Sequence, residues 1–219
     1  MKTAIIIGAT GLVGSELVKL LLEDSRYEKV LVFGRRSLEI DHEKLEEKLI
    51  DFDAPDEWKH LVKGDVFFST LGTTMKKAGS PSAQYKVDYY YQYIFAEAAA
   101  SNKVPVYVLV SAPGASPESV MFYTRMKGTL ERDVKKLDFE SIHFIRPGLL
   151  HGDRDENRKG EKGAYYILKA VNTVGLFRGY RPIDGKTVGK AMIHAAESGD
   201  NGVKIYELKE VFKLAEGNI

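Results

Sequence analysis

Short, mostly apolar runs recur along the chain and are separated by amphipathic stretches. Such runs are typical of parallel strands covered on both faces, because these strands carry apolar residues without strict alternation. The strands predicted in this way are residues 4–7, 30–33, 45–52, 65–70, 104–110, 142–145 and 203–208. The strand predicted at 45–52 follows a charged connection that has no clear pattern.

Between these runs, apolar residues recur at helical spacing. In residues 12–23, leucines and valines lie three and four positions apart while charged residues fall elsewhere, as in a helix laid on a sheet. Strands that alternate with helices predict an α/β fold, doubly wound and Rossmann-type, with a mostly parallel sheet. The length of 219 residues suits one domain, so we predict a single domain over 1–219 with a small cap from 149–219. The other predicted helices are 56–62, 82–100, 165–174, 187–197 and one that opens at Tyr123.

Glycine occupies every third position between the first predicted strand and the first predicted helix. Glycines allow a tight turn, a close approach of backbone to ligand and close packing of helix on strand, while the helix N-terminus offers free N–H groups to a pyrophosphate. This turn therefore predicts a dinucleotide site, although a glycine-rich turn without ligand is the alternative. The predicted contact residues are Gly8, Thr10, Gly11, Leu12, Val13 and Gly14.

The second predicted strand ends at Gly34-Arg35-Arg36. A site that prefers NAD usually carries an acidic residue about 20 residues beyond the glycine motif, where it accepts from the ribose 2′-hydroxyl. Arginine at this place suits a 2′-phosphate, which a carboxylate would repel. Arg35 and Arg36 therefore favour NADP (NADPH) as cofactor. The alternative is a pair of solvated loop charges.

Two further strand ends supply candidate cofactor contacts. Asp53 follows the third predicted strand, where its carboxylate can meet an adenine amino group or cap the next helix. Leu71, Gly72 and Thr73 follow the fourth predicted strand. Small and hydroxylated residues there let a cofactor pass over the strand ends, which is the usual ligand crevice of such sheets.

Tyr123 and Lys127 lie four positions apart at the start of a predicted helix, so they share one face of it. The positive charge of Lys127 favours the phenolate of Tyr123, which makes Tyr123 a plausible proton donor to a carbonyl oxygen, or acceptor in reverse. Ser111, at the end of the fifth predicted strand, would hold that oxygen. We therefore predict Ser111, Tyr123 and Lys127 as the catalytic set.

Taken in order, these features resemble the atypical branch of the short-chain dehydrogenase/reductase superfamily. More narrowly, they resemble the small NAD(P)-binding oxidoreductases of the Tat-interacting-protein group, over nearly the whole chain. The segments that carry this resemblance are the glycine turn, 71–74, 77–80, 85–88, 123–128 and 146–150.

The resemblance implies a role for each matching residue. The glycines would hold the pyrophosphate, Arg35 and Arg36 the 2′-phosphate, and Lys127 the nicotinamide ribose. Pro147 and Gly148 would lie beside the nicotinamide. The superfamily often supports the lysine through an asparagine in its fourth helix, whereas this chain has Asp88 near that place.

These features predict an NADP-dependent oxidoreductase that transfers hydride between the nicotinamide and a small carbonyl or alcohol substrate. The alternative is a protein that senses NADP(H) or uses it to regulate a partner, because the same fold and glycine turn serve both roles. Only the enzyme needs an activated phenol.

Composition limits the other possibilities. The formal net charge is only +1, so the overall charge of the chain does not favour nucleic acid or an anionic membrane as a partner. The chain has no cysteine, which fits a reducing compartment, and its five histidines show no metal-ligand spacing, so no metal is expected. Lys2 precedes an apolar run without a cleavage site, which we interpret as a buried strand of a cytoplasmic protein.

The roles of the predicted helix 82–100 and of the loop 151–163 each have two interpretations. Tyr85, Tyr89 and Tyr93 form a stripe on the predicted helix 82–100, which either packs on the sheet or forms the interface of a homodimer. Residues 151–163 are charged and contain glycine, as in a surface loop. That loop either closes over substrate through Arg154 or Arg158 or remains solvated.

Overall fold

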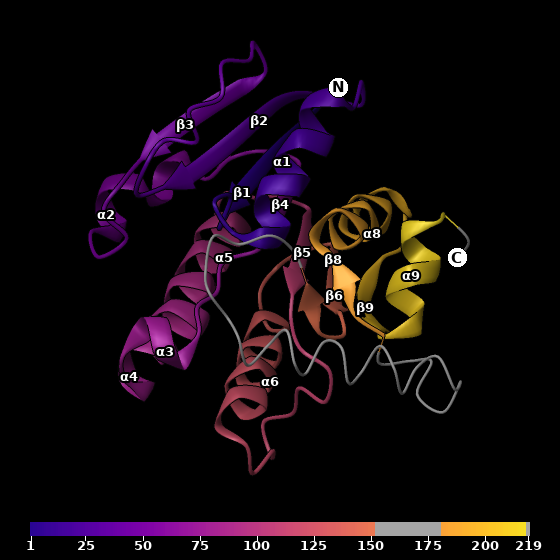
Figure 1. Ribbon diagram of the computed structural model, residues 1–219. Coiled ribbons are helices and arrows are strands. Elements are labelled where there is room, and N and C mark those ends of the chain that lie inside the picture. The colour runs from indigo at the N-terminus through magenta and orange to yellow at the C-terminus, as the bar shows by residue number, and fades with distance from the viewer. Residues whose placement is uncertain (152–180, 218–219) are drawn as a thin grey trace.

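The computed structural model describes residues 1–151 and 181–217. Its centre is a seven-stranded sheet in the order β3-β2-β1-β4-β5-β6-β9, and every neighbouring pair is parallel (Figure 1). This order reverses direction after β1, as in doubly wound folds, and confirms the predicted fold class. The strands are β1 (Lys2–Ile7), β2 (Tyr27–Gly34), β3 (Leu45–Leu49), β4 (Val66–Ser69), β5 (Val106–Val110), β6 (Ser141–Arg146) and β9 (Gly202–Glu207).

Helices cover both faces of the sheet (Figure 1). Ile6 of β1 packs in one core with helices on the first face, whereas Ile5 and Ile7 pack in the other core, because successive side chains of a strand point to opposite faces. Both faces are buried, which explains the continuous apolar runs. The first layer contains α1 (Leu12–Glu23), α8 (Gly185–Glu197) and α9 (Lys209–Ala215), and the second contains α2 (Pro55–Trp58), α5 (Gln92–Ser101) and α6 (Phe122–Val134).

The long helix predicted at 82–100 is built from three consecutive pieces. These are α4 (Pro81–Tyr85), a π-helical stretch (Lys86–Tyr91) and α5. The short α3 (Met75–Ala78) precedes them, capped by the Thr74 side chain. Periodicity does not predict a π-helical stretch, since it widens the turn by one residue without changing the composition.

Several element boundaries differ from the prediction. The third strand ends at Leu49 rather than at 52, because its neighbour β2 ends at Gly34, whose carbonyl takes the last ladder bond from Ile50 N–H. The helix predicted at 56–62 is divided into α2 and a 3₁₀ turn (Lys59–Leu61). The small helix α9 was not predicted at all.

The C-terminal part contributes to the same layers as the N-terminal part. Helix α8 begins at Gly185, where the Asp184 carboxylate accepts from Thr187 N–H at 2.7 Å, and it packs on α1. A two-stranded parallel pair, β7 (Leu150–His151) and β8 (Ile183–Asp184), joins this part to the end of β6. The predicted helix 165–174 and nearly all of the predicted loop 151–163 lie outside the described residues. None of the described helices combines the length and apolar character needed to cross a membrane.

Candidate cofactor and catalytic site

The glycine turn joins β1 to α1 and lies against the end of β4. Gly8 has φ +82°, a conformation that favours glycine, and a Cβ there would lie 2.4 Å from the Leu71 backbone nitrogen. A Cβ on Gly14 would lie 2.2 Å from the Gly8 carbonyl oxygen. Gly11 caps the 12-residue helix α1 without a side-chain hydrogen bond, so N–H groups of the first turn remain available to a ligand. The turn thus has the backbone cradle that a dinucleotide pyrophosphate needs.

Arg35 and Arg36 directly follow β2, at the same edge of the sheet as the glycine turn. Both side chains are exposed, and within the described residues neither guanidinium has an ion-pair partner. Their donors are therefore free for an anionic group.

Asp53 lies at this edge too, but its carboxylate is already engaged. It accepts from Tyr91 Oη at 2.8 Å and pairs with Lys86 Nζ at 2.7 Å, and the Lys86 hydrogen bond is the main cause that lowers the pKa of this carboxyl. The cap position of α2 is occupied by Ala54. Asp53 therefore does not cap the next helix, which corrects one of the two alternatives predicted for it.

Residues 71–73 run from the end of β4 past a buried carboxylate. Thr73 N–H donates to Asp88 Oδ2 at 3.0 Å, and Asp88 Oδ1 lies 3.7 Å from Lys127 Nζ. Asp88 therefore connects the predicted cofactor segment to the predicted catalytic lysine.

Tyr123 and Lys127 lie one turn apart on α6. The Tyr123 ring is 41% exposed, whereas the Lys127 side chain is only 3% exposed and its Nζ points toward the Val110 carbonyl at 3.4 Å. Tyr123 is therefore accessible to a ligand, whereas Lys127 is enclosed by the protein.

Ser111 is buried at the end of β5, and its hydroxyl donates to Glu131 Oε1 at 2.5 Å. Glu131 also pairs with Arg146, whose nitrogens lie 2.6 Å and 3.0 Å from the two carboxylate oxygens. The hydroxyl hydrogen of Ser111 is therefore already used in a hydrogen bond to Glu131 in this structure. Glu131 follows Lys127 by four residues, so the spacing alone could have placed it on the same helix face.

Pro147 and Gly148 follow Arg146 at the end of β6 and lead into β7. Arg146 also donates to the Ala115 carbonyl at 3.0 Å and pairs with Glu207 at 3.3 Å. One buried guanidinium therefore fixes α6, the strand end before Pro147 and the last strand relative to one another.

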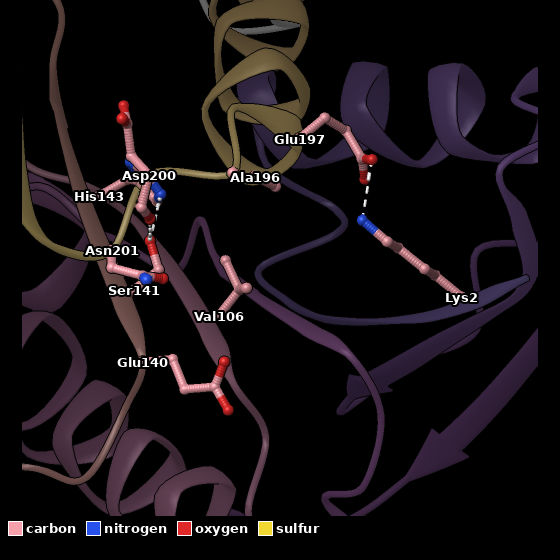
Figure 2. Close-up of a pocket in the computed structure, with 10 residues that line it drawn as sticks. Lys2, Val106, Glu140, Ser141, His143, Ala196, Glu197, Asp200 and Asn201 are labelled. Carbon is pink, nitrogen blue, oxygen red and sulfur yellow. Dashed lines mark hydrogen bonds and ion pairs between the residues drawn. The ribbon is translucent and has the colours of Figure 1, made fainter.

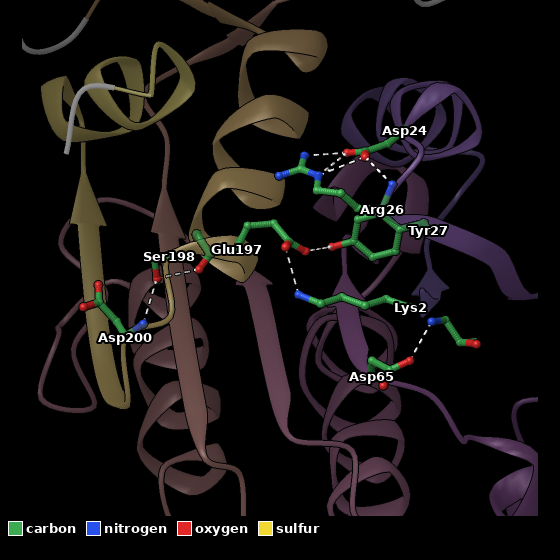
Figure 3. Close-up of polar contacts among 10 residues, drawn as sticks. Lys2, Asp24, Arg26, Tyr27, Asp65, Glu197, Ser198 and Asp200 are labelled. Carbon is green, nitrogen blue, oxygen red and sulfur yellow. Dashed lines mark hydrogen bonds and ion pairs between the residues drawn. The ribbon is translucent and has the colours of Figure 1, made fainter.

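A second polar cluster lies at the opposite, amino end of the sheet (Figure 2). It surrounds a cavity of about 220 Å³, where Ser141 Oγ lies 2.6 Å from His143 Nε2 and donates to the Asp200 carbonyl at 2.7 Å. Glu197 pairs with Lys2 at 2.8 Å and accepts from Tyr27 Oη at 2.7 Å (Figure 3). None of the predicted site residues belongs to this cluster.

Comparison with known proteins supports the cofactor site. A family described as NAD(P)H-binding matches residues 8–167. The mitochondrial protein FMP52 of Candida albicans is 35% identical over 97% of this chain and 94% of its own length. Its counterpart from Eremothecium gossypii is 37% identical over 97% of each chain.

Solved structures show the same fold at low identity. A UDP-N-acetylglucosamine 4-epimerase from Methanobrevibacter ruminantium has a TM-score of 0.71 and 17% identity, covering 97% of this chain and 80% of that one. The Bordetella bronchiseptica enzyme WbmH, in complex with NAD⁺, has a TM-score of 0.70 and 17% identity, covering 94% and 76%.

The relatives also correct one prediction. They are named mitochondrial proteins, so the predicted cytoplasmic location is wrong. The lack of cysteine and of a cleavage site does not determine the cellular location of a protein, because receptors recognise targeting signals independently of the folded domain. The match over residues 8–167 shows that this chain belongs to the family described as NAD(P)H-binding, and the solved structures share its fold.

Proposed function

We propose that this protein is an NADP(H)-dependent oxidoreductase that interconverts a small carbonyl compound and its alcohol. The observation that carries the proposal is the placement of exposed Tyr123 and buried Lys127 one turn apart on α6, the helix that follows β5. Ligands of doubly wound sheets bind at the carboxyl ends of the strands.

The residues present fit the cofactor. Gly8 and Gly14 leave no space for a Cβ, and the N-terminus of α1 offers N–H groups to the pyrophosphate. Arg35 and Arg36 would pair with the 2′-phosphate, since their guanidinium groups are exposed and unpaired in the described part of the chain. Structural neighbours hold NAD, so the preference for NADP rests on these arginines.

Proton transfer falls to Tyr123 in this proposal. When bound, the nicotinamide supplies hydride to a carbonyl carbon or accepts it from the carbinol. Tyr123 gives its phenolic proton to the carbonyl oxygen or takes it back in the reverse direction, and the Lys127 ammonium stabilises the phenolate. In this proposal Ser111 does not donate to the substrate, because its hydroxyl already donates a hydrogen bond to Glu131.

A Tyr123→Phe variant tests the proposal with a panel of small aldehydes and ketones and NADPH. The variant keeps the ring and deletes the phenolic oxygen, so turnover falls about 100-fold or more while NADPH affinity changes little. Loss of nicotinamide absorbance measures turnover, and calorimetry measures affinity. Tyr90→Phe is the matched control, because this tyrosine is 43% exposed and lies on a different helix.

Two results would contradict the enzyme proposal. If wild-type protein binds NADPH but turns over no member of the panel above background, the sensor role is favoured instead. If Tyr123→Phe retains wild-type turnover, Tyr123 is not the proton donor.

A further inference from the structure

A cavity lies between α8 and α9, which pack side by side in the first helix layer (Figure 1). Its volume is about 390 Å³, and small-molecule sites have volumes of about 300–1,000 Å³. None of the predicted cofactor or catalytic residues is among the described residues that line it. Its walls come from Thr187 and Lys190 of α8, Phe212 and Ala215 of α9, and Arg181 and Pro182 before β8.

The walls of this cavity are fixed by contacts of the fold. His194 Nδ1 of α8 donates to the Leu214 carbonyl of α9 at 2.6 Å, and Phe212 packs against the core of the first layer. On the third side, Ile183 N–H donates to the Leu149 carbonyl at 3.0 Å. The cavity is therefore part of the fold, because hydrogen bonds and core packing hold all three sides.

The Arg181 guanidinium covers one aromatic wall of the cavity. Its Cζ lies 3.6 Å from the centre of the Phe212 ring, which is a cation–π contact. Such a contact uses the face of the guanidinium and leaves the N–H groups in its plane able to donate. Within the described residues Arg181 has no ion-pair partner. Phe212 therefore orients a charged group whose donors remain available.

Lys190 adds a second positive charge to the same cavity. Its side chain is exposed, and it forms no ion pair in the part of the chain that the structure describes. Like charges that line one cavity repel each other, so an anion between them is favoured. Glu216 also lines the cavity, but it has an interaction of its own and forms no ion pair with these two described cations.

The lining also indicates which anion fits. A phosphate monoester carries a charge of about −1.5 to −2 near neutral pH, which two cations balance better than they balance the single charge of a carboxylate. A guanidinium can bind two phosphate oxygens at once, and an ammonium group acts as a point charge. Pro182, Phe212 and Ala215 offer an apolar wall to the rest of the ligand. The cavity therefore suits a small organic phosphate with an apolar part.

We propose that the cavity between α8 and α9 binds an organic phosphate, with the phosphate on Arg181 and Lys190 and the apolar part against Phe212. The site shares no residue with the proposed cofactor site, so the inference goes beyond the proposed function and does not depend on it. The phosphate belongs to a free ester or to a lipid headgroup, because both present the same chemical group.

An NMR titration of the full chain with phenyl phosphate tests this site and locates it. We expect the backbone N–H resonances of Thr187, Lys190 and Phe212 to shift, while the resonances of the glycine turn report separately on binding at the cofactor site. Phenyl phosphate should bind about tenfold more tightly than benzoate, since the phosphate carries more charge. Benzylamine, which is a cation, should cause no shifts at these residues.

Variants at the two cations test the proposed contacts. Arg181→Gln and Lys190→Gln should each weaken phenyl phosphate about five- to tenfold, because each removes a charge-assisted contact with the phosphate. Lys186→Gln is the matched control, since Lys186 is an exposed lysine of the same helix outside the described lining. Its effect should be less than about twofold.

Co-sedimentation with phosphatidylcholine vesicles, with and without phosphatidic acid, identifies the source of the phosphate. Sedimentation that requires phosphatidic acid and is lost in Arg181→Gln would support a lipid headgroup. Binding of phenyl phosphate without sedimentation would support a free ester.

Two results would overturn the proposal. One is a titration in which phenyl phosphate shifts no resonance in 187–190 or 212–215. The other is equal weakening by Lys186→Gln and Lys190→Gln, which would assign the binding to the general positive charge of α8 rather than to the cavity.

Discussion

The two ends of the sheet use their polar groups differently. At the amino end, charged and polar side chains surround a cavity but bond mainly to one another, as Glu197 does with Lys2 and Tyr27. At the carboxyl end, Arg35 and Arg36 are unpaired within the described residues, and Tyr123 is exposed. The carboxyl end, where the proposed function places the site, therefore differs from the amino end in polar groups that remain available rather than in a hollow of the surface.

The amino-end contacts have a structural role. Glu197 lies at the end of α8 and connects it to β1 through Lys2 and to β2 through Tyr27 (Figure 3). These partners are 195 and 170 residues away in sequence. Variants at this end should change stability without changing cofactor affinity, and the following predictions use that contrast.

The largest effect is expected for Gly14→Ala at the carboxyl end. The new Cβ would lie 2.2 Å from the Gly8 carbonyl oxygen and 2.6 Å from Thr70 Oγ1, so α1 must move away from β1. We expect a loss of about 3 kcal/mol in the free energy of unfolding together with lost cofactor affinity. Urea denaturation and calorimetry measure the two effects.

Gly11→Ala serves as its control, since a Cβ there would lie 3.1 Å from the same oxygen at an ordinary φ of −83°. Its cost should be about 1 kcal/mol or less. An equal loss of unfolding free energy in the two variants would show that the close packing of α1 on β1 does not require glycine at position 14.

A smaller effect is expected at the amino end when the pH falls. Burial lowers the pKa of His143 from 6.5 to about 4. Because the folded-state pKa lies below the unfolded value, the unfolded chain binds more protons between these pH values, and stability falls as the pH drops through this window. The loss should reach about 2 kcal/mol at pH 5.

Urea denaturation of wild type and His143→Gln between pH 7 and pH 5 measures this loss. The variant should lose about 2 kcal/mol less than wild type over that range, with cofactor affinity at pH 7 unchanged. Parallel pH dependence of the two proteins would assign the acid sensitivity to other groups.

The smallest effect concerns cofactor choice. Arg35→Ala removes a charge-assisted contact, so NADPH affinity should fall about tenfold, or about 1.4 kcal/mol, while NADH affinity stays nearly constant. Calorimetry with both nucleotides measures the difference. Equal wild-type affinities for NADPH and NADH would contradict the assignment of the 2′-phosphate to this arginine.

The sequence predicted the sheet, the glycine turn and the helix that carries Tyr123, because each depends on local periodicity or on glycine. It did not predict the partner of Ser111, since the direction of a hydroxyl at a strand end depends on tertiary neighbours such as Glu131. The resemblance placed Asp88 near the residue that supports the lysine, but local periodicity could not predict the ion pair with Lys127, because it depends on the packing of two helical segments distant in sequence.

Helix α9 was missed for a related reason. It begins at Lys209, directly after Leu208, whose φ of 53° is uncommon for a residue other than glycine and cannot be predicted from the sequence. Its buried side chains, Val211 and Leu214, are too few to give a clear periodic pattern.

The position of β9 has a consequence for how the chain folds. This last strand pairs with β6, whose Phe144 and Ile145 are fully buried, so the edge of β6 stays open until residues 202–207 are in place. An unpaired apolar strand edge is a template for wrong pairing between chains. A chain in which β9 is not yet in place therefore exposes an aggregation-prone edge, and the pairing of β9 with β6 covers it.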